Sequence, residues 1–355
     1  MALRVEKRFD VPRWMDWGLP LISFALALAV GALLLGLLGV SPLKAYGEMI
    51  RGSLGDGYGI SETIVKAIPI ALCGLAVALA FTMVVWNIGA EGQLVAGALA
   101  ATAAVRFFPL ESPFLMIPLM VLVAAAAGGL WAAFAGWLKA RWSVNEIITT
   151  LMMNYIAILG LEYFVYGPWR DPMSLGFPLT PTFHDAARLP QLFGTRVHYG
   201  LFLALLVAFL LRTALRWSRW GYEIRVIGQN PRAAAYAGMA TSHHIVLTLF
   251  LSGAIAGLAG MGEVAGLQGR LQPGFSVGYG FTAIIVAWLA RLNPFAILVV
   301  SFFMGALLVG GDTLQVVMRL PLSSVQVLQG LILFFVLAGE FFRNYKVCLR
   351  RREDA

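Results

Sequence analysis

The residues best placed to act chemically lie between two long apolar runs, in the segment WNIGAEGQ at 86–93. Asn87 and Glu91 are one helical turn apart and share a helix face. A charged side chain at such depth in a membrane costs about 3 kcal/mol on insertion scales, so Glu91 needs a partner or a purpose. Two interpretations stay open. Asn87, Glu91 and Gln93 line a solute pathway, or they are helix-packing contacts in which Glu91 caps a helix start at the cytoplasmic surface.

A second polar cluster, WSVNEIITTLMMNYIA, occupies 142–157. Ser143 and Glu146 have the spacing of a capping box, which predicts a helix start there. Asn154 and Tyr155 come later in an apolar run, where a polar side chain faces another helix or a cavity. We therefore add Asn145, Asn154 and Tyr155 to the candidate pathway residues.

A third segment, 218–242, is polar and basic but contains helix signals. Asn230 can cap a helix that begins at Pro231, and Gly238 can end it. A plain connector would not need an exposed apolar helix, so a docking surface is favoured over a simple loop. The candidate docking residues are Gly221, Arg225, Asn230, Pro231, Ala233, Ala234, Ala235, Tyr236 and Gly238.

The composition places these segments in a membrane protein. Of 355 residues, 60% are hydrophobic and only 12% charged, about half the usual charged fraction. Apolar stretches of about 20 residues recur along the chain, which predicts an all-α, multi-pass protein with about ten transmembrane helices. The net charge is +8, and the basic residues lie in short loops and at the termini, where positive charge sets the topology and contacts anionic lipid. It is not a nucleic-acid signature.

The ten predicted spans lie near 19–40, 64–86, 88–106, 113–138, 146–167, 199–217, 243–266, 279–290, 295–311 and 325–342. With ten spans, every strongly basic segment falls on one side, which predicts that both termini are cytoplasmic. The segment 1–18 and the basic tail 343–355 then flank a transmembrane domain, 19–342. The outside loops 41–63 and 168–198 show no helical period. Spans two to five and seven to ten enter from opposite sides, as in inverted-repeat transporters, although the internal similarity is too weak to establish a repeat.

The chain lacks the motifs of an enzyme that drives transport. No lysine is followed by Ser or Thr, so there is no phosphate-binding Walker A loop, and no metal-ligand or nucleophile spacing appears. The alternative of a membrane-embedded enzyme would use intramembrane acids: Glu91, Glu146, Glu162, Glu263 and Asp312. The absence of a catalytic pairing favours transport with no cofactor in this chain.

Four motifs in order resemble permease subunits of ABC importers: NIGAEGQLVAGALAA (87–101), VNEIITTLMMNYIA (144–157), GYEIRVIGQNPRAAAYAGM (221–239) and GYGFTAIIVAWLARLNPFA (278–296). The resemblance is to the branch with branched-chain amino-acid, simple-sugar and nucleoside permeases, most of all to the larger nucleoside (guanosine/purine) subunit. It covers most of the chain beyond the first helix.

This resemblance implies the fold of type II importer permeases in a bacterial cytoplasmic (inner) membrane. It implies a separate ATPase that hydrolyses ATP and docks on the coupling loop near 218–242. It also implies a second permease chain, expected to be a paralogue, and an extracytoplasmic solute-binding protein. Nucleosides are the expected solutes, and simple sugars or branched-chain amino acids are the alternatives.

Overall fold

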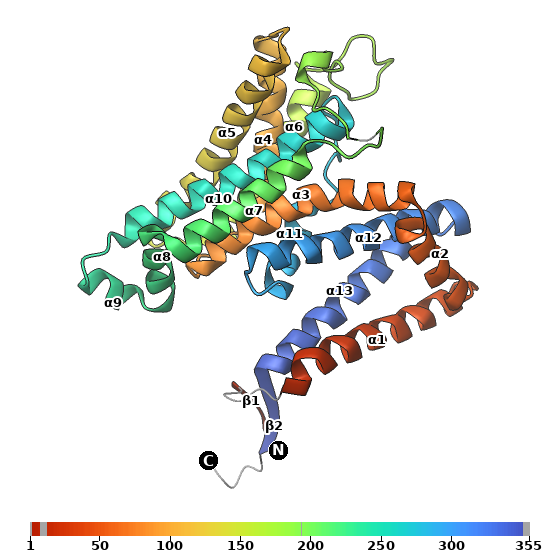
Figure 1. Ribbon diagram of the computed structural model, residues 1–355, viewed down its shortest axis with the longest axis vertical. Helices are drawn as coiled ribbons and strands as arrows, with labels where there is room; N and C mark the ends of the chain where they lie inside the picture. The colour runs from red at the N-terminus through yellow and green to blue at the C-terminus, as the bar shows by residue number, and fades with distance from the viewer. Residues whose placement is uncertain (1, 8–12, 193, 351–355) are drawn as a thin grey trace. The chain divides into compact units, whose positions relative to one another are not determined.

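The computed structural model describes residues 2–7, 13–192 and 194–350, and helices dominate it (Figure 1). Between its ends, a helix bonds its backbone groups within its own segment, which a hydrocarbon environment requires. The helices are α1 (Arg13–Leu37), α2 (Pro42–Leu54), α3 (Gly57–Thr82), α4 (Ala90–Phe107), α5 (Pro113–Trp142), α6 (Glu146–Tyr166), α7 (Gly200–Trp217), α8 (Arg219–Gln229), α9 (Pro231–Tyr236), α10 (Thr241–Glu263), α11 (Tyr279–Leu289), α12 (Pro294–Met318) and α13 (Leu322–Asn344). A π-helical turn, Val264–Gln268, prolongs α10.

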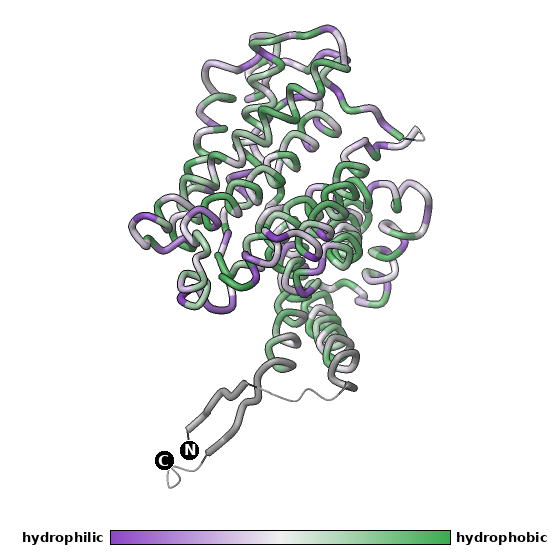
Figure 2. The backbone as a smooth tube through the Cα atoms, turned by 60° about the vertical axis from the view of Figure 1, so that its left-hand side comes forward, coloured by the Kyte–Doolittle hydropathy of each residue, from purple (hydrophilic) through white to green (hydrophobic). Residues whose placement is uncertain are grey.

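Two short strands, β1 (Ala2–Lys7) and β2 (Tyr345–Arg350), pair antiparallel near the two ends of the chain. They are an addition to the predicted all-helical architecture. Apolar residues run along the helices and polar residues gather at their ends and in the connecting segments (Figure 2).

Each of the ten predicted spans coincides with a helix, but the number of crossings is not established as ten. Among the described residues, seven helices are long and apolar enough to cross a membrane, or up to eight if the bent pair α1 and α2 forms one span. Neither α4 nor α11 is among these seven. With 11 residues, α11 is too short to cross alone.

The expectation that 41–63 has no helical period is wrong, because it contains α2 and the start of α3. Pro42 occupies the first turn of α2, where its missing N–H is harmless. Ala45, Met49 and Ser53 recur every four residues and form its buried face. That face packs in a cluster with residues of α1, α12 and α13, which include Leu35, Leu314 and Leu328.

The chain divides into two compact units, residues 1–59 with 306–355, and residues 60–305. The second unit contains the three motif regions and is built around α10, which runs beside α5 (Figure 1). Glycines bring these backbones together: a Cβ on Gly253 would lie 2.2 Å from Gly128 O. A Cβ on Gly97 of α4 would likewise lie 2.2 Å from Gly257 O. Small residues at such crossings are the usual packing device of membrane helices.

Candidate functional site

A non-helical crossover at 83–89 separates α3 from α4 and carries the first polar motif. The Asn87 side chain has no exposed surface, and its amide makes four hydrogen bonds inside the protein. Its Nδ2 donates to Gln93 Oε1 at 3.0 Å and to Ser252 Oγ of α10 at 2.8 Å. Its Oδ1 accepts from Gly89 N at 3.0 Å and from Gln93 Nε2 at 2.8 Å. Asn87 and Gln93 therefore tie the crossover to the start of α4 and to α10.

The second polar motif holds the same crossover from α6. Asn154 Oδ1 accepts from Gly92 N at 2.8 Å, and Asn154 Nδ2 donates to Ile88 O at 2.9 Å. Thr150 Oγ1 accepts from Ile88 N at 3.3 Å and donates to Glu146 O at 2.6 Å. Asn154 thus bonds to one of the otherwise unpaired N–H groups in the first turn of α4.

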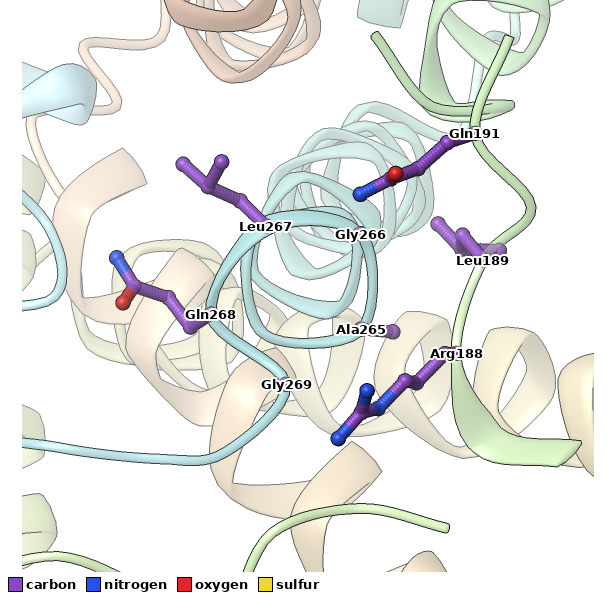
Figure 3. A pocket seen from close by; sticks show the side chains of 8 residues that line it. All are labelled: Arg188, Leu189, Gln191, Ala265, Gly266, Leu267, Gln268 and Gly269. Atoms are coloured by element: carbon purple, nitrogen blue, oxygen red, sulfur yellow. The ribbon is translucent and has the colours of Figure 1, made fainter. Parts of the chain in front are cut away.

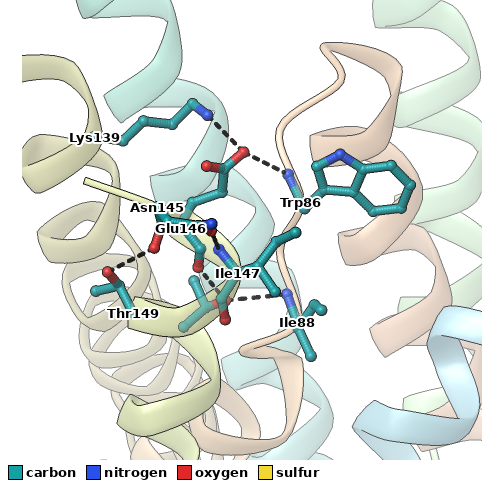
Figure 4. A network of polar contacts seen from close by, with 8 residues as sticks. Trp86, Ile88, Lys139, Asn145, Glu146, Ile147 and Thr149 are labelled. Carbon is teal, nitrogen blue, oxygen red and sulfur yellow. Dashed lines mark hydrogen bonds and ion pairs between the residues drawn. The ribbon is translucent and has the colours of Figure 1, made fainter. Parts of the chain in front are cut away.

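A partly buried ion pair joins the α5–α6 turn to the crossover (Figure 4). Lys139 Nζ lies 2.5 Å from Glu146 Oε1, and Trp86 N donates to the same oxygen at 3.4 Å. The predicted capping box is wrong in its partners. Asn145 caps α6 by accepting from Ile147 N at 2.9 Å, while Ser143 ends α5 in a left-handed conformation, with φ of 55°. Glu146 is therefore free to pair with Lys139.

Glu91 lies where the N-termini of two short helices, α4 and α11, meet. Its Oε2 accepts from Gly280 N in the first turn of α11 at 2.7 Å. A Cβ on Gly280 would lie 2.3 Å from Glu91 N, so the two backbones are in contact. Two helix N-termini carry partial positive charge, and a carboxylate between them offsets it. Glu91 is 3% exposed and bonds to a neighbouring helix rather than capping its own.

The predicted pathway residues thus separate into two groups. Asn87, Glu91, Gln93 and Asn154 are buried, and all four bond within the protein: Asn87, Gln93 and Asn154 to one another or to residues of the crossover and the start of α4, and Glu91 to α11. Asn145 is an exposed helix cap, and Tyr155 is 56% exposed on α6. A solute-lining role for these six residues stays a prediction.

The docking segment folds as two helices, of which the sequence predicted α9. Asn230 Oδ1 accepts from Arg232 N and Ala233 N, both at 3.1 Å. Gly238, with φ of +80°, ends α9, and Met239 N donates to Ala234 O at 3.0 Å. These bonds form a Schellman motif, in which a left-handed glycine closes the helix.

Not all of the candidate docking residues on α9 are exposed. Ala233, Ala235 and Tyr236 are exposed, the last at 97%, whereas Ala234 has no exposed surface. The preceding helix α8 was not predicted. It packs Gly221 against α7, where a Cβ would lie 2.3 Å from Ala214 O, and Gly228 against the end of α3, 2.7 Å from Thr82 O.

Glu223 anchors α8 to α10. Its carboxylate lies 2.8 Å from His244 Nε2 and 3.2 Å from Arg219 Nε. The bond to His244 holds the pKa of Glu223 below its usual range, with a smaller effect from Arg219. The carboxylate is therefore charged at neutral pH.

At the 168–198 loop, the chain forms a pocket of about 350 Å³ that the sequence did not predict (Figure 3). Arg188, Leu189 and Gln191 of the loop face the turn Ala265–Gly269 at the end of α10. Leu189 N donates to Ala265 O at 2.9 Å and Phe183 N to Gly269 O at 2.7 Å, so backbone bonds fix the loop. Such bonds leave no signal in the sequence.

Two buried ionisable side chains lie near this end of α10. Burial lowers the pKa of His198 to about 4, so the ring is neutral. Its Nδ1 accepts from Gly200 N at 3.1 Å, while Nε2 has no partner among the described residues. Glu263 is 2% exposed and neither of its carboxylate oxygens has a hydrogen-bond partner there. Within the described ranges, no group of three His, Cys, Asp or Glu side chains could hold a metal.

The described residues thus combine apolar helices, hydrogen-bonded breaks between them and a capped surface helix, an arrangement that membrane transporters commonly have. The family model for the permease component of branched-chain amino acid transport systems matches residues 59–337. The chain therefore belongs to this family of ABC transporter permeases, and it is a multi-pass membrane protein.

Three relatives match along most of their length. A glucose ABC transporter permease of Haloferax volcanii is 38% identical over 100% of this chain and 97% of its own. A guanosine ABC transporter permease of Bacillus subtilis is 35% identical over 91% and 94%. A nucleoside ABC transporter permease of Lactococcus lactis is 26% identical over 89% of each chain. The predicted family is confirmed, and the relatives differ in the solute they are named for.

Proposed function

We propose that this chain forms half of the pathway of an importer for uncharged solutes that carry a sugar ring, with purine nucleosides the first candidate. The observation that carries the proposal is the set of similar relatives, which are named for glucose, guanosine and nucleosides. A glucose molecule and a nucleoside share a ring with several hydroxyl groups and lack a net charge. A branched-chain amino acid, the alternative in the family's description, is a zwitterion.

The charge distribution of the broken region supports an uncharged solute. Both acids of the two motifs have internal partners, Glu91 with Gly280 N and Glu146 with Lys139. A fixed charge with a partner inside the chain is not available as a counter-charge for an amino acid. Hydroxyl and base recognition needs amides, aromatic faces and polarisable side chains instead.

We place the pathway on the exposed side of α6, around Tyr155. Met152, Tyr155 and Ile156 are 48%, 56% and 58% exposed, and Tyr155 and Ile156 lie in the middle third of α6, a helix 21 residues long. No described residue bonds to the Tyr155 hydroxyl. A hydroxyl facing lipid at this depth would be unsatisfied, so this face of α6 meets either water or another protein chain. Asn87, Glu91, Gln93 and Asn154 would then support the pathway from behind, and Asn145 would lie at its edge.

The complete transporter would need partners that this chain lacks. Bacillus subtilis has two guanosine permeases similar to this chain, at 35% and 25% identity, which supports a heterodimer of paralogous permeases. We infer that an ATPase binds ATP and docks on α8 and α9, that a solute-binding protein delivers the solute outside, and that the assembly lies in the bacterial inner membrane.

An uptake assay in a deletion strain tests the solute. We expect the strain to lose uptake of labelled guanosine and adenosine while leucine uptake is unchanged, and the intact gene to restore it. Glucose is the second candidate because the 38% identical relative is named for glucose. Loss of glucose uptake alone would replace nucleosides with hexoses, and loss of leucine uptake alone would refute a sugar-ring solute.

A pair of substitutions tests α9 as the coupling helix. Ala235 is exposed, so Ala235→Asp should leave the fold intact. It should prevent binding of the ATPase to α9 and thereby abolish ATP-driven uptake. Ala234 is buried, so Ala234→Asp should lower stability as well, since an unpaired buried charge is strongly destabilising. The thermal unfolding midpoint and copurification of the ATPase separate the two effects. Normal uptake by Ala235→Asp would show that the ATPase docks elsewhere.

A further inference from the structure

A basic groove of about 610 Å³ lies at the α8 end of the second unit. Its charged wall is Arg212 and Arg216 of α7 with Arg225 of α8. The groove is also lined by Phe81, Thr82, Val84, Leu215, Leu292 and Pro294. Cations on one side and a mostly apolar surface on the other make this groove amphipathic.

The three arginines have no counter-charge in the described part of the chain. None of them makes an ion pair or hydrogen bond with a described residue, and no acid is among the lining residues. The nearby carboxylate of Glu223 is already bonded to Arg219 and His244. Three adjacent positive charges repel one another, so an anion in the groove would lower their energy. Arginine in particular matches phosphate oxygens in bidentate geometry.

The position of the groove indicates where the anion comes from. Arg212 and Arg216 lie in the last turns of α7, a membrane-spanning candidate that ends at Trp217. Trp217 is 78% exposed and Arg216 lies 5.5 Å from its ring centre, an arrangement suited to the membrane–water interface. This end also carries the basic residues that the charge pattern assigns to the cytoplasm, where the leaflet is rich in anionic lipid.

We propose that this groove binds the phosphate headgroup of an anionic phospholipid, with its glycerol and upper acyl chains against Phe81, Val84 and Leu292. Val84 is 55% exposed and could meet a lipid chain directly. Because the cations come from both α7 and α8, one headgroup would hold the coupling region onto the membrane span beside it.

Lipid retention by the full-length purified chain tests the proposal. Native mass spectrometry after exchange into mixed micelles would compare phosphatidylglycerol with phosphatidylcholine. We expect the wild-type chain to retain phosphatidylglycerol, and Arg212→Gln with Arg216→Gln to weaken retention by about tenfold or more, since the variant loses two charge-assisted contacts to the phosphate. The control pair Arg141→Gln with Arg232→Gln removes the same charge from exposed positions outside the groove and should retain the lipid.

Further arms separate other sources of the anion. Arg212→Lys with Arg216→Lys keeps the charge and should retain a preference for phosphatidylglycerol at lower affinity, even if the glutamine pair fails to fold. Displacement of the lipid by excess inorganic phosphate would identify a free anion and refute the lipid assignment. Equal retention of both lipids by the wild-type chain would also refute the lipid assignment. So would unchanged retention of phosphatidylglycerol in the glutamine and lysine variants of Arg212 and Arg216. A loss of ATPase copurification with unchanged lipid retention would assign the arginines to a protein partner instead.

Discussion

At the residue scale, Asn154 shows how a polar side chain inside a membrane helix can stabilise a break in a neighbouring helix. Its amide bonds to one N–H and one C=O of the crossover, at Gly92 and Ile88. Both backbone groups lie where a regular helix would have bonded them internally. Asn154 therefore substitutes for missing helical bonds, and its chemical requirement is one donor and one acceptor in a fixed place.

Asn154→Leu should reduce stability rather than alter solute choice. It leaves two buried backbone groups without partners, at about 1–3 kcal/mol each. We expect a lower thermal unfolding midpoint and a fall in uptake that follows the amount of folded protein. Tyr155→Phe is the matched control for the unfolding midpoint alone, because it removes an exposed hydroxyl with no partner in the described chain. Wild-type stability in Asn154→Leu would contradict the structural role.

We expect His198 to make the fold sensitive to acid at the loop end of α10. Burial depresses the pKa of His198 to about 4, from an ordinary value of 6.5. Between pH 6.5 and 4 the unfolded chain therefore binds a proton at His198 more readily than the folded chain does. The free energy of unfolding is unaffected by this difference above pH 6.5 and decreases as the pH falls toward 4. The shift corresponds to about 3 kcal/mol. His198→Asn, which keeps an acceptor for Gly200 N, should flatten the decline of the unfolding midpoint between pH 6.5 and 4. An unchanged slope would contradict this role.

At the element scale, the contact of α4 with α11 depends on the absence of a side chain at one glycine. A Cβ on Gly280 would lie 2.3 Å from Glu91 N and 2.6 Å from Glu91 Cα, both backbone atoms that cannot move independently. Gly280→Ala should therefore separate the two helices and destabilise the fold by about 1–3 kcal/mol or more. Gly160→Ala is the control, since nothing lies within 4 Å of a Cβ there. Thermal unfolding measures both variants, and equal midpoints would refute the close approach.

The broken elements also explain the disagreement over the number of spans. The irregular segments are the crossover at 83–89, which carries the first polar motif, the short helix α11 and the π-helical turn after α10. Discontinuous helices at corresponding places are a common plan of transporter binding regions. The irregular backbone is tolerated there because protein side chains, rather than lipid, satisfy it.

At the scale of the whole molecule, the charge pattern predicts that the 168–198 loop is outside and α8 is cytoplasmic. Thr182 and Arg225 are both exposed and lie in these two regions. In a Cys348→Ser background, with Cys73 fully buried, an impermeant thiol reagent on intact cells should label Thr182→Cys but not Arg225→Cys. Permeabilised cells should label both. Labelling of Arg225→Cys alone in intact cells would show that the orientation is the opposite of the predicted one.

By itself the sequence determined the membrane class, the helical architecture, the family and the α9 helix. These properties depend on local composition: apolar runs, an Asn-Pro start and a Gly stop act over a few residues and are visible in one dimension. The amphipathic helix α2 was missed because its buried face is small and interrupted by polar residues.

Only the tertiary structure decided which groups meet across long separations. Glu91 and Gly280 are 189 residues apart, Asn87 and Ser252 are 165 apart, and no local pattern links them. The partner of Glu146 changed from a helix cap to Lys139 for the same reason. The arginine groove arises because α7, α8 and the end of α3 converge. A single sequence specifies which side chains are polar, but the bonds that satisfy them depend on which backbones pack together.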